Sequence, residues 1–189
     1  MPIEVEKKYR LTAAQRAEIE ERLRSLGLSP RPVEFEENTL YRGGAVDLGL
    51  CSLRLRRVNG RAMLTFKKRL PSASPIKHQL ENECEVANAD GMDAILRSLG
   101  YTPGLIYEKR RTRWHVDTAK VVIDQLPFGL FMEVEASEEE INRVEELLKL
   151  RDLPAVAETY PNLTVKHGID HDGIIEARFG TEPLPVGSR

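Results

Sequence analysis

Polar and apolar residues alternate through the first ten positions of the chain. Side chains of a β-strand point to opposite faces with a period of two, so this segment predicts a strand with one charged and one apolar face. The charged face carries Glu4, Glu6, Lys8 and Arg10. Taken alone, the pattern is typical of a half-buried antiparallel strand whose charged face meets water.

The same alternation recurs along the chain, with complementary charges each time. The turn signal Asn59-Gly60 predicts a tight hairpin between two of these segments, and Phe128-Gly129 predicts another turn. The predicted strands after the first lie near residues 35–41, 51–58, 61–69, 79–87, 105–113, 120–126 and 130–136.

Three segments have helical spacing of apolar residues instead. One opens with a capping box at Thr12 to Gln15, a second starts at Asp90, and a third opens at Ser137. The remainder predicts a short helix followed by an irregular tail. We therefore divide the chain into one domain over residues 1–170 and an irregular segment over 171–189, whose last ~15 residues we expect to be disordered.

Composition narrows the class of protein. Hydrophobic residues make up 41% and charged residues 31% of 189 residues, which is typical of one soluble globular domain. The net charge of −2 provides no general attraction for nucleic acid or an anionic membrane. No apolar run approaches the ~18 residues of a membrane span. Cys51 and Cys84 match no metal spacing, so we expect reduced cysteines in a cytoplasmic protein.

The charged strand faces carry both signs. Their cations are Lys8, Arg54, Arg56, Lys67, Lys109, Arg111 and Arg113; their acids are Glu4, Glu6, Glu81, Glu83, Glu85, Asp124, Glu133 and Glu135. The amphipathic helices need the apolar strand faces to pack against. If the sheet closes into a barrel with helices outside, the charged faces point inward. A dry interior of this kind would be very costly, so the pattern indicates a water-filled site for a charged ligand.

Several cations on separate strands suit a polyanion such as a chain of phosphates, because arginine offers planar two-point contacts. Clustered carboxylates suit Mg²⁺ or Mn²⁺, which prefer oxygen ligands and bridge to phosphate oxygens. Together they favour phosphoryl transfer. The alternative is that the charges form paired ladders across a solvated sheet face, with no ligand.

The segment Glu4-Val-Glu-Lys-Lys8 resembles the ExExK signature of the CYTH superfamily, the triphosphate tunnel metalloenzymes. This family includes class IV adenylate cyclases, thiamine triphosphatases and inorganic triphosphatases. The resemblance extends in order over about residues 1–165, through Leu53-Arg-Leu-Arg56, Phe66-Lys67, Glu81-x-Glu-x-Glu85, Lys109-x-Arg111, Asp124 and Glu133-x-Glu135. It implies an α+β fold: an eight-stranded antiparallel β-barrel that forms a tunnel with a charged interior and helices outside.

The resemblance also implies roles for individual residues. The triphosphate would be bound by Lys8, Arg54, Arg56, Lys67, Lys109 and Arg111, with Lys8 and Lys67 as catalytic residues. Mg²⁺ or Mn²⁺ would be bound by Glu4, Glu6, Asp124, Glu133 and Glu135, supported by Glu83, Glu85 and Arg113. The hairpin from Asp124 to Glu133 is about one residue tighter than is usual in the family, which leaves open whether Glu133 or Glu135 is the direct ligand. Tyr160 lies where family members have a tyrosine near a C-terminal plug.

Three functions follow from this reading. The first is metal-dependent hydrolysis of a triphosphate, namely tripolyphosphate, thiamine triphosphate or a nucleoside triphosphate. The second is a class IV cyclase that converts ATP to cyclic AMP and pyrophosphate, and the third is a non-catalytic binder of polyphosphate or nucleotide. We predict hydrolysis, because it is the less demanding chemistry. The predicted partner is a small molecule that carries a triphosphate, and fold analogy suggests a homodimer.

Overall fold

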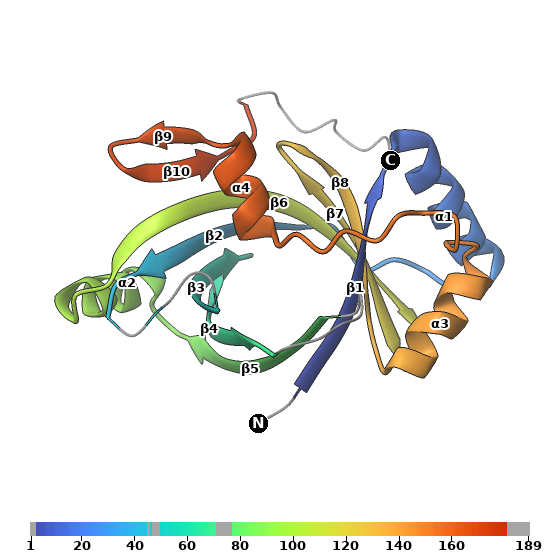
Figure 1. Ribbon diagram of the computed structural model, residues 1–189, viewed down its shortest axis with the longest axis horizontal. Helices are drawn as coiled ribbons and strands as arrows, with labels where there is room; N and C mark the ends of the chain where they lie inside the picture. Colours follow the sequence, from blue (N-terminus) through green and yellow to red (C-terminus); the bar gives the residue numbers. More distant parts are fainter. Residues whose placement is uncertain (1–2, 45, 47–49, 71–76, 181–189) are drawn as a thin grey trace.

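Eight antiparallel strands form a closed barrel, which confirms the predicted fold (Figure 1). The computed structural model describes residues 3–44, 46, 50–70 and 77–180, with only the backbone for residues 3, 4 and 77. The barrel strands are β1 (Ile3–Leu11), β2 (Glu34–Arg42), β3 (Cys51–Val58), β4 (Arg61–Arg69), β5 (Lys77–Val86), β6 (Thr102–Val116), β7 (Ala119–Leu126) and β8 (Gly129–Glu135).

The barrel closes through three pairings between strands that are distant in sequence, β1 with β5, β1 with β8, and β2 with β6. Hydrogen-bonded neighbours run in the order β2-β3-β4-β5-β1-β8-β7-β6, and β2 pairs with β6 to complete the ring. The first strand lies between β5 and β8, with Glu4 opposite Gln79 and Lys8 opposite Glu133. The register therefore places Glu6 and Lys8 of β1 directly beside the two glutamates of β8.

Two helices cover the outer face of β1, β6, β7 and β8. Helix α1 (Ala13–Ser25) begins with the predicted capping box of Thr12 and Gln15, and α3 (Glu138–Leu147) begins where the Ser137 side chain accepts from the Glu140 N–H. The apolar strand faces pack against them in a core that contains Tyr9, Leu23, Val121, Met132 and Val144. Because these apolar side chains point outward, the alternate charged side chains of the same strands point into the barrel.

A third helix covers part of the opposite side of the barrel. Helix α2 (Ala89–Ser98), capped by the Asn88 side chain, packs Leu96 against Tyr41 and Leu55.

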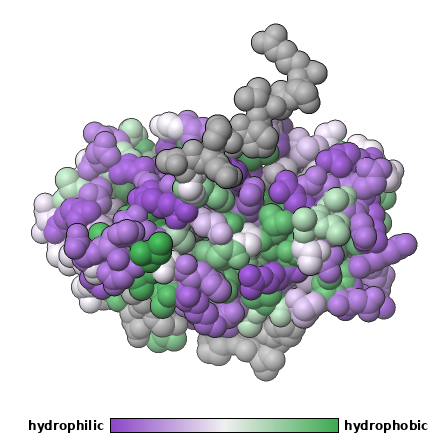
Figure 2. Space-filling view, turned by 90° about the horizontal axis from the view of Figure 1, so that it is seen from above, coloured by the Kyte–Doolittle hydropathy of each residue, from purple (hydrophilic) through white to green (hydrophobic). Residues whose placement is uncertain are grey.

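On the face seen in Figure 2, hydrophilic side chains predominate and smaller hydrophobic areas lie between them. None of the helices in the described part of the chain combines the length and apolar character needed to span a bilayer.

The fourth helix, α4 (Tyr160–His167), packs on one end of the barrel. Here the inner positions of several strands are apolar, and Leu40, Tyr107, Leu126 and Phe131 form a buried cluster with Leu163 of the helix. This cluster occupies the inner positions of the strands at that end, next to the charged inner positions.

The segment after α4 is more regular than the sequence predicted. Instead of an irregular tail from residue 171, the chain forms β9 (Ile169–His171) and β10 (Ile174–Ala177), joined by a turn at Asp172 and Gly173 with positive φ. Strand β7 pairs with β6 only at 110–116, so the edge of β6 at residues 105–107 accepts β10 as a parallel neighbour. The predicted disorder of residues 181–189 lies outside the described residues.

Candidate functional site

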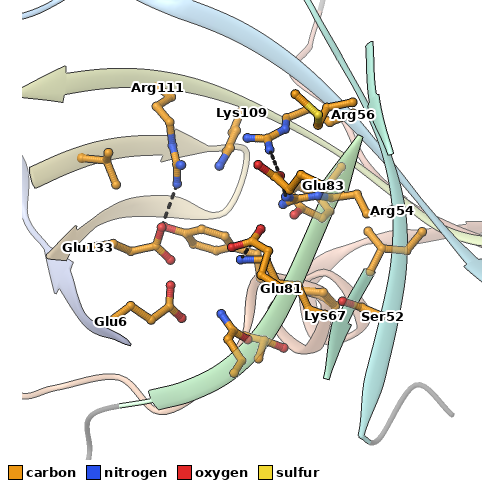
Figure 3. A pocket seen from close by; sticks show the side chains of 18 of the residues that line it. Glu6, Ser52, Arg54, Arg56, Lys67, Glu81, Glu83, Lys109, Arg111 and Glu133 are labelled. Carbon is orange, nitrogen blue, oxygen red and sulfur yellow. Dashed lines mark hydrogen bonds and ion pairs between the residues drawn. The ribbon is translucent and has the colours of Figure 1, made fainter. Parts of the chain in front are cut away.

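The barrel encloses a cavity of about 1530 Å³ whose wall is highly charged. All six predicted phosphate-binding residues, Lys8, Arg54, Arg56, Lys67, Lys109 and Arg111, line it. In Figure 3, Arg111 and Glu133 point toward each other on one side, and Arg56 and Glu83 meet on another. Strands β1, β3, β4 and β6 each contribute cations, as the alternation predicted.

A row of alternating charges crosses the inner face of β6, β7, β8 and β1. Arg111 donates to Asp124 through Nε and Nη2, at 2.7 and 2.5 Å, and its Nη2 also donates to Glu133 Oε2 at 2.7 Å. Lys8 Nζ lies 3.1 Å from Glu133 Oε1. Burial alone would lower the pKa of Arg111, but Asp124 and the nearby glutamates raise it well above its usual value. Pairing is what makes these buried charges tolerable.

The row continues to Glu36, which the sequence analysis missed. Glu36 is fully buried, and its carboxylate lies 3.3 Å from Lys109 Nζ, 3.3 Å from Arg113 Nη2 and 3.8 Å from Arg56 Nη1. Burial would raise its pKa, but Lys109, Arg111 and Arg56 lower it to about 2. The signal was present in the alternation of Glu34, Glu36 and Asn38, which matches that of the other charged strand faces.

Lys109 joins the two parts of this row. Its Nζ lies 3.3 Å from Glu36 and 3.6 Å from Asp124. We call the connected residues the charge row: Glu36, Lys109, Asp124, Arg111, Glu133 and Lys8. Every member is less than 9% exposed.

Three predicted metal ligands lie together. Oxygens of Glu6, Glu133 and Glu135 all come within 4.8 Å of one another, because β1 pairs with β8 in a register that sets Glu6 opposite Glu135. We call them the carboxylate cluster. An all-oxygen donor set of this kind fits Mg²⁺ or Mn²⁺. The side chain of Glu4 lies outside the described residues.

The fifth predicted ligand, Asp124, has a different environment. Both of its oxygens accept hydrogen bonds from Arg111, and Oδ2 also accepts one from the Tyr160 hydroxyl at 2.8 Å. It is fully buried and lies outside the carboxylate cluster. In this structure Asp124 orients Arg111 and Tyr160.

Tyr160 and its neighbours face the charge row from the start of α4. The Thr159 side chain caps this helix by accepting from the Asn162 N–H, which fixes Tyr160 at the first helical position. Lys8 Nζ lies 3.9 Å from the centre of the Tyr160 ring and donates to the Glu158 carbonyl. Burial, followed by the charges of Asp124 and Glu133, raises the pKa of Tyr160 well above its usual value.

The β3–β5 side of the cavity is more open. Glu83 accepts hydrogen bonds from Thr65 and Arg56, each at 2.8 Å, and Lys67 lies 3.2 Å from Glu81. The Glu83 side chain is 36% exposed. Of the other predicted supporting residues, Glu85 lines the cavity, and Arg113 pairs with Glu34 and Glu36 at its edge.

Solved structures of similar shape come from distant organisms. The PH1012 protein of Pyrococcus horikoshii OT3 is 21% identical with a TM-score of 0.73, and the match covers 85% of this chain and 98% of that one. A Vibrio parahaemolyticus protein described as a candidate adenylate cyclase is 20% identical with a TM-score of 0.65, covering 85% and 97%. HpAC1 from Hippeastrum, a candidate adenylyl cyclase described as revealing a dominant triphosphatase activity, is 19% identical with a TM-score of 0.62, covering 82% and 90%. At such identities these matches show a shared fold.

Sequence comparison says more about the family of this chain than the shared fold does. No curated protein matches the chain. The model of the CYTH domain family, however, matches residues 2–157, which span all eight strands of the barrel and every residue of the charge row and of the carboxylate cluster. The chain therefore belongs to the CYTH family.

Proposed function

We propose that this protein is a divalent-metal-dependent triphosphatase that binds the triphosphate of its substrate inside the barrel. The observation that carries the proposal is the convergence of six lysine and arginine side chains on one cavity, with the carboxylate cluster in the same wall. A triphosphate needs several cations around it, and a hard metal ion needs oxygen ligands beside it.

The arginines and lysines would bind the phosphate groups from different sides. Arg54 and Arg56 reach into the cavity from β3, and Arg111 reaches in from β6. Their planar guanidinium groups suit two-point contacts with phosphate oxygens. Lys8 and Lys67 lie on other strands and would place ammonium groups against the phosphoryl group that is transferred.

The carboxylate cluster, Glu6, Glu133 and Glu135, would hold Mg²⁺ or Mn²⁺. When bound, such an ion stabilises the charge that develops on phosphate oxygens during transfer. The glutamates fix its position because they come from two paired strands.

A class IV cyclase is the second candidate, supported by the description of the Vibrio parahaemolyticus protein. It would use the same cations but attack the α-phosphorus of ATP with the ribose 3′-hydroxyl. The description of HpAC1 as having a dominant triphosphatase activity favours hydrolysis for a barrel of this shape.

Product analysis tests the proposal. Purified protein would be incubated with tripolyphosphate, thiamine triphosphate or ATP, in Mg²⁺ and then in Mn²⁺. The double variant Glu6→Gln, Glu135→Gln should lose activity by a factor of at least about 100, in line with removal of an electrostatic stabiliser from the reacting group. Glu139→Gln, which removes a charge from the exposed face of α3, is the matched control.

Three outcomes separate the candidates. Orthophosphate release that the double variant loses and Glu139→Gln keeps would support a triphosphatase, and the preferred substrate would define it. Cyclic AMP with pyrophosphate would identify a cyclase. Saturable metal-dependent binding without any product would make the barrel a binding module.

A further inference from the structure

Glu133 belongs to two groups of residues at once. Its Oε1 lies 3.1 Å from Lys8 Nζ and its Oε2 accepts from Arg111 Nη2 at 2.7 Å, so both oxygens serve the charge row. The same side chain is a member of the carboxylate cluster with Glu6 and Glu135. The charge row and the carboxylate cluster share no other residue.

These two roles of Glu133 compete with each other. Lys8 and Arg111 would be repelled by a divalent cation held on the same carboxylate, because unit charges a few ångströms apart interact strongly in a buried site. Each would then give up its contact with Glu133. Arg111 would stay attached to Asp124 by two hydrogen bonds, and Lys8 would stay near the Glu158 carbonyl and the Tyr160 ring. Both side chains line the cavity, so their unused N–H groups would face a ligand there.

We propose that Glu133 is a positioning residue that couples occupation of the carboxylate cluster to phosphate binding. Without a metal ion, Glu133 neutralises Lys8 and Arg111 and so lowers the affinity of the cavity for phosphate. With the cluster occupied, these two cations become available to the triphosphate. The coupling is reciprocal, so bound phosphate also strengthens metal binding. This inference rests on the proposed function, because it assumes that the cavity binds a triphosphate.

Measuring tripolyphosphate binding in the absence of metal separates the effect of Glu133 on Lys8 and Arg111 from direct metal–phosphate contacts. Isothermal titration calorimetry in EDTA would compare the wild-type protein with Glu133→Gln, in which the neutral amide no longer attracts Lys8 and Arg111. We expect binding about tenfold tighter in the variant, within the range of typical coupling between sites. Glu135→Gln is the matched control, because it removes the same charge from the same cluster and keeps the Glu133 carboxylate that contacts Lys8 and Arg111. Its affinity should change less than about threefold.

The reciprocal experiment does not depend on a stable Glu133 variant. Lys8→Gln should bind Mn²⁺ more tightly than the wild-type protein when no phosphate is present, because Glu133 is then less engaged. Lys67→Gln removes the same charge from the opposite side of the cavity, where Lys67 pairs with Glu81, and should leave Mn²⁺ affinity nearly unchanged.

Equal effects in each variant and its control would overturn the inference, because net charge alone would explain them. No tightening in either Glu133→Gln or Lys8→Gln would overturn it as well. Failure of the proposed function looks different: the wild-type protein would bind no tripolyphosphate even with Mg²⁺ or Mn²⁺ present.

Discussion

The two sides of the barrel wall share one sequence pattern but differ in their physical state. On β1, β6, β7 and β8, helices α1 and α3 cover the outer face, and the inner charges form the buried charge row. On β3, β4 and β5, helix α2 covers only part of the outer face: Cys84 of β5 is exposed outside and Glu83 is exposed inside. Alternation predicts which face a residue takes, whereas burial depends on what packs against the strand.

This difference separates fixed charges from adjustable ones. Buried ion pairs hold one geometry, because breaking one leaves an uncompensated charge in a medium of low polarity. Exposed pairs exchange partners with water at little cost. Until an ion occupies the carboxylate cluster, the charge row therefore gives the cavity its shape, whereas the β3–β5 side can rearrange around a ligand without such an ion.

The largest expected difference between the two sides is in the stability that is lost when an acidic residue is removed. Replacing Asp124 by alanine leaves Arg111 and Lys109 without their shared partner, so we expect a loss of about 3–5 kcal/mol in the free energy of unfolding. The equivalent change on the open side, Glu83→Ala, should cost less than about 1 kcal/mol. Urea denaturation of both variants measures the difference. Similar losses would show that the two sides are equally rigid.

A second, intermediate effect concerns acid stability. The pKa of Glu36 in the folded protein is about 2, below the ordinary value of 4.5. The stability that its ionised form contributes is fully present above about pH 4.5 and is lost as the pH falls toward 2. Glu36→Gln should therefore be less stable than the wild-type protein at neutral pH, and the gap should narrow over this range.

Denaturation curves at several pH values test this expectation, and Glu139→Gln controls for the loss of one acidic residue. A gap between Glu36→Gln and the wild-type protein that stays constant from pH 5 to about pH 2 would contradict the assigned direction of the pKa shift.

The smallest effect compares two tyrosine hydroxyls, each of which donates to an aspartate. Tyr160 donates to the fully buried Asp124, and Tyr41 donates to the partly exposed Asp93 of α2 at 2.5 Å. Tyr160→Phe should cost about 2 kcal/mol, since hydrogen bonds to charged groups are worth about 1.5–3 kcal/mol. Tyr41→Phe should cost about 1 kcal/mol, because Asp93 is partly exposed and stays solvated without the hydroxyl. Thermal unfolding would rank the two variants, and the reverse order would show that the burial of the accepting aspartate does not set the cost.

The sequence predicted most of the fold because each element had a local signal. Strand alternation, the Asn59-Gly60 turn and the Thr12 capping box all depend on neighbouring residues, and all appear in the structure. The charged interior followed from one further step, namely that the apolar faces must pack against helices.

What the sequence did not predict depends on register and on long-range pairing. The family resemblance assigned Asp124 to the metal, but no local pattern shows that the register of β6 and β7 sets it directly opposite Arg111. Glu36 shares the alternation of the charged strand faces, but nothing local shows that three cations from β3 and β6 surround it. The β9–β10 hairpin pairs with β6 along an edge that β7 leaves unpaired, and this pairing depends on segments distant in sequence.

The position of β1 between β5 and β8 has a consequence for folding kinetics. Residues 7–11 of β1 pair only with β8 among the described strands, so half of the first strand has no neighbour until the last barrel strand arrives. Contacts between such distant segments form slowly, because the intervening chain must first be ordered. During synthesis Lys8 therefore stays exposed to water until β8, which carries Glu133, pairs with β1. The site is then among the last parts of the protein to form.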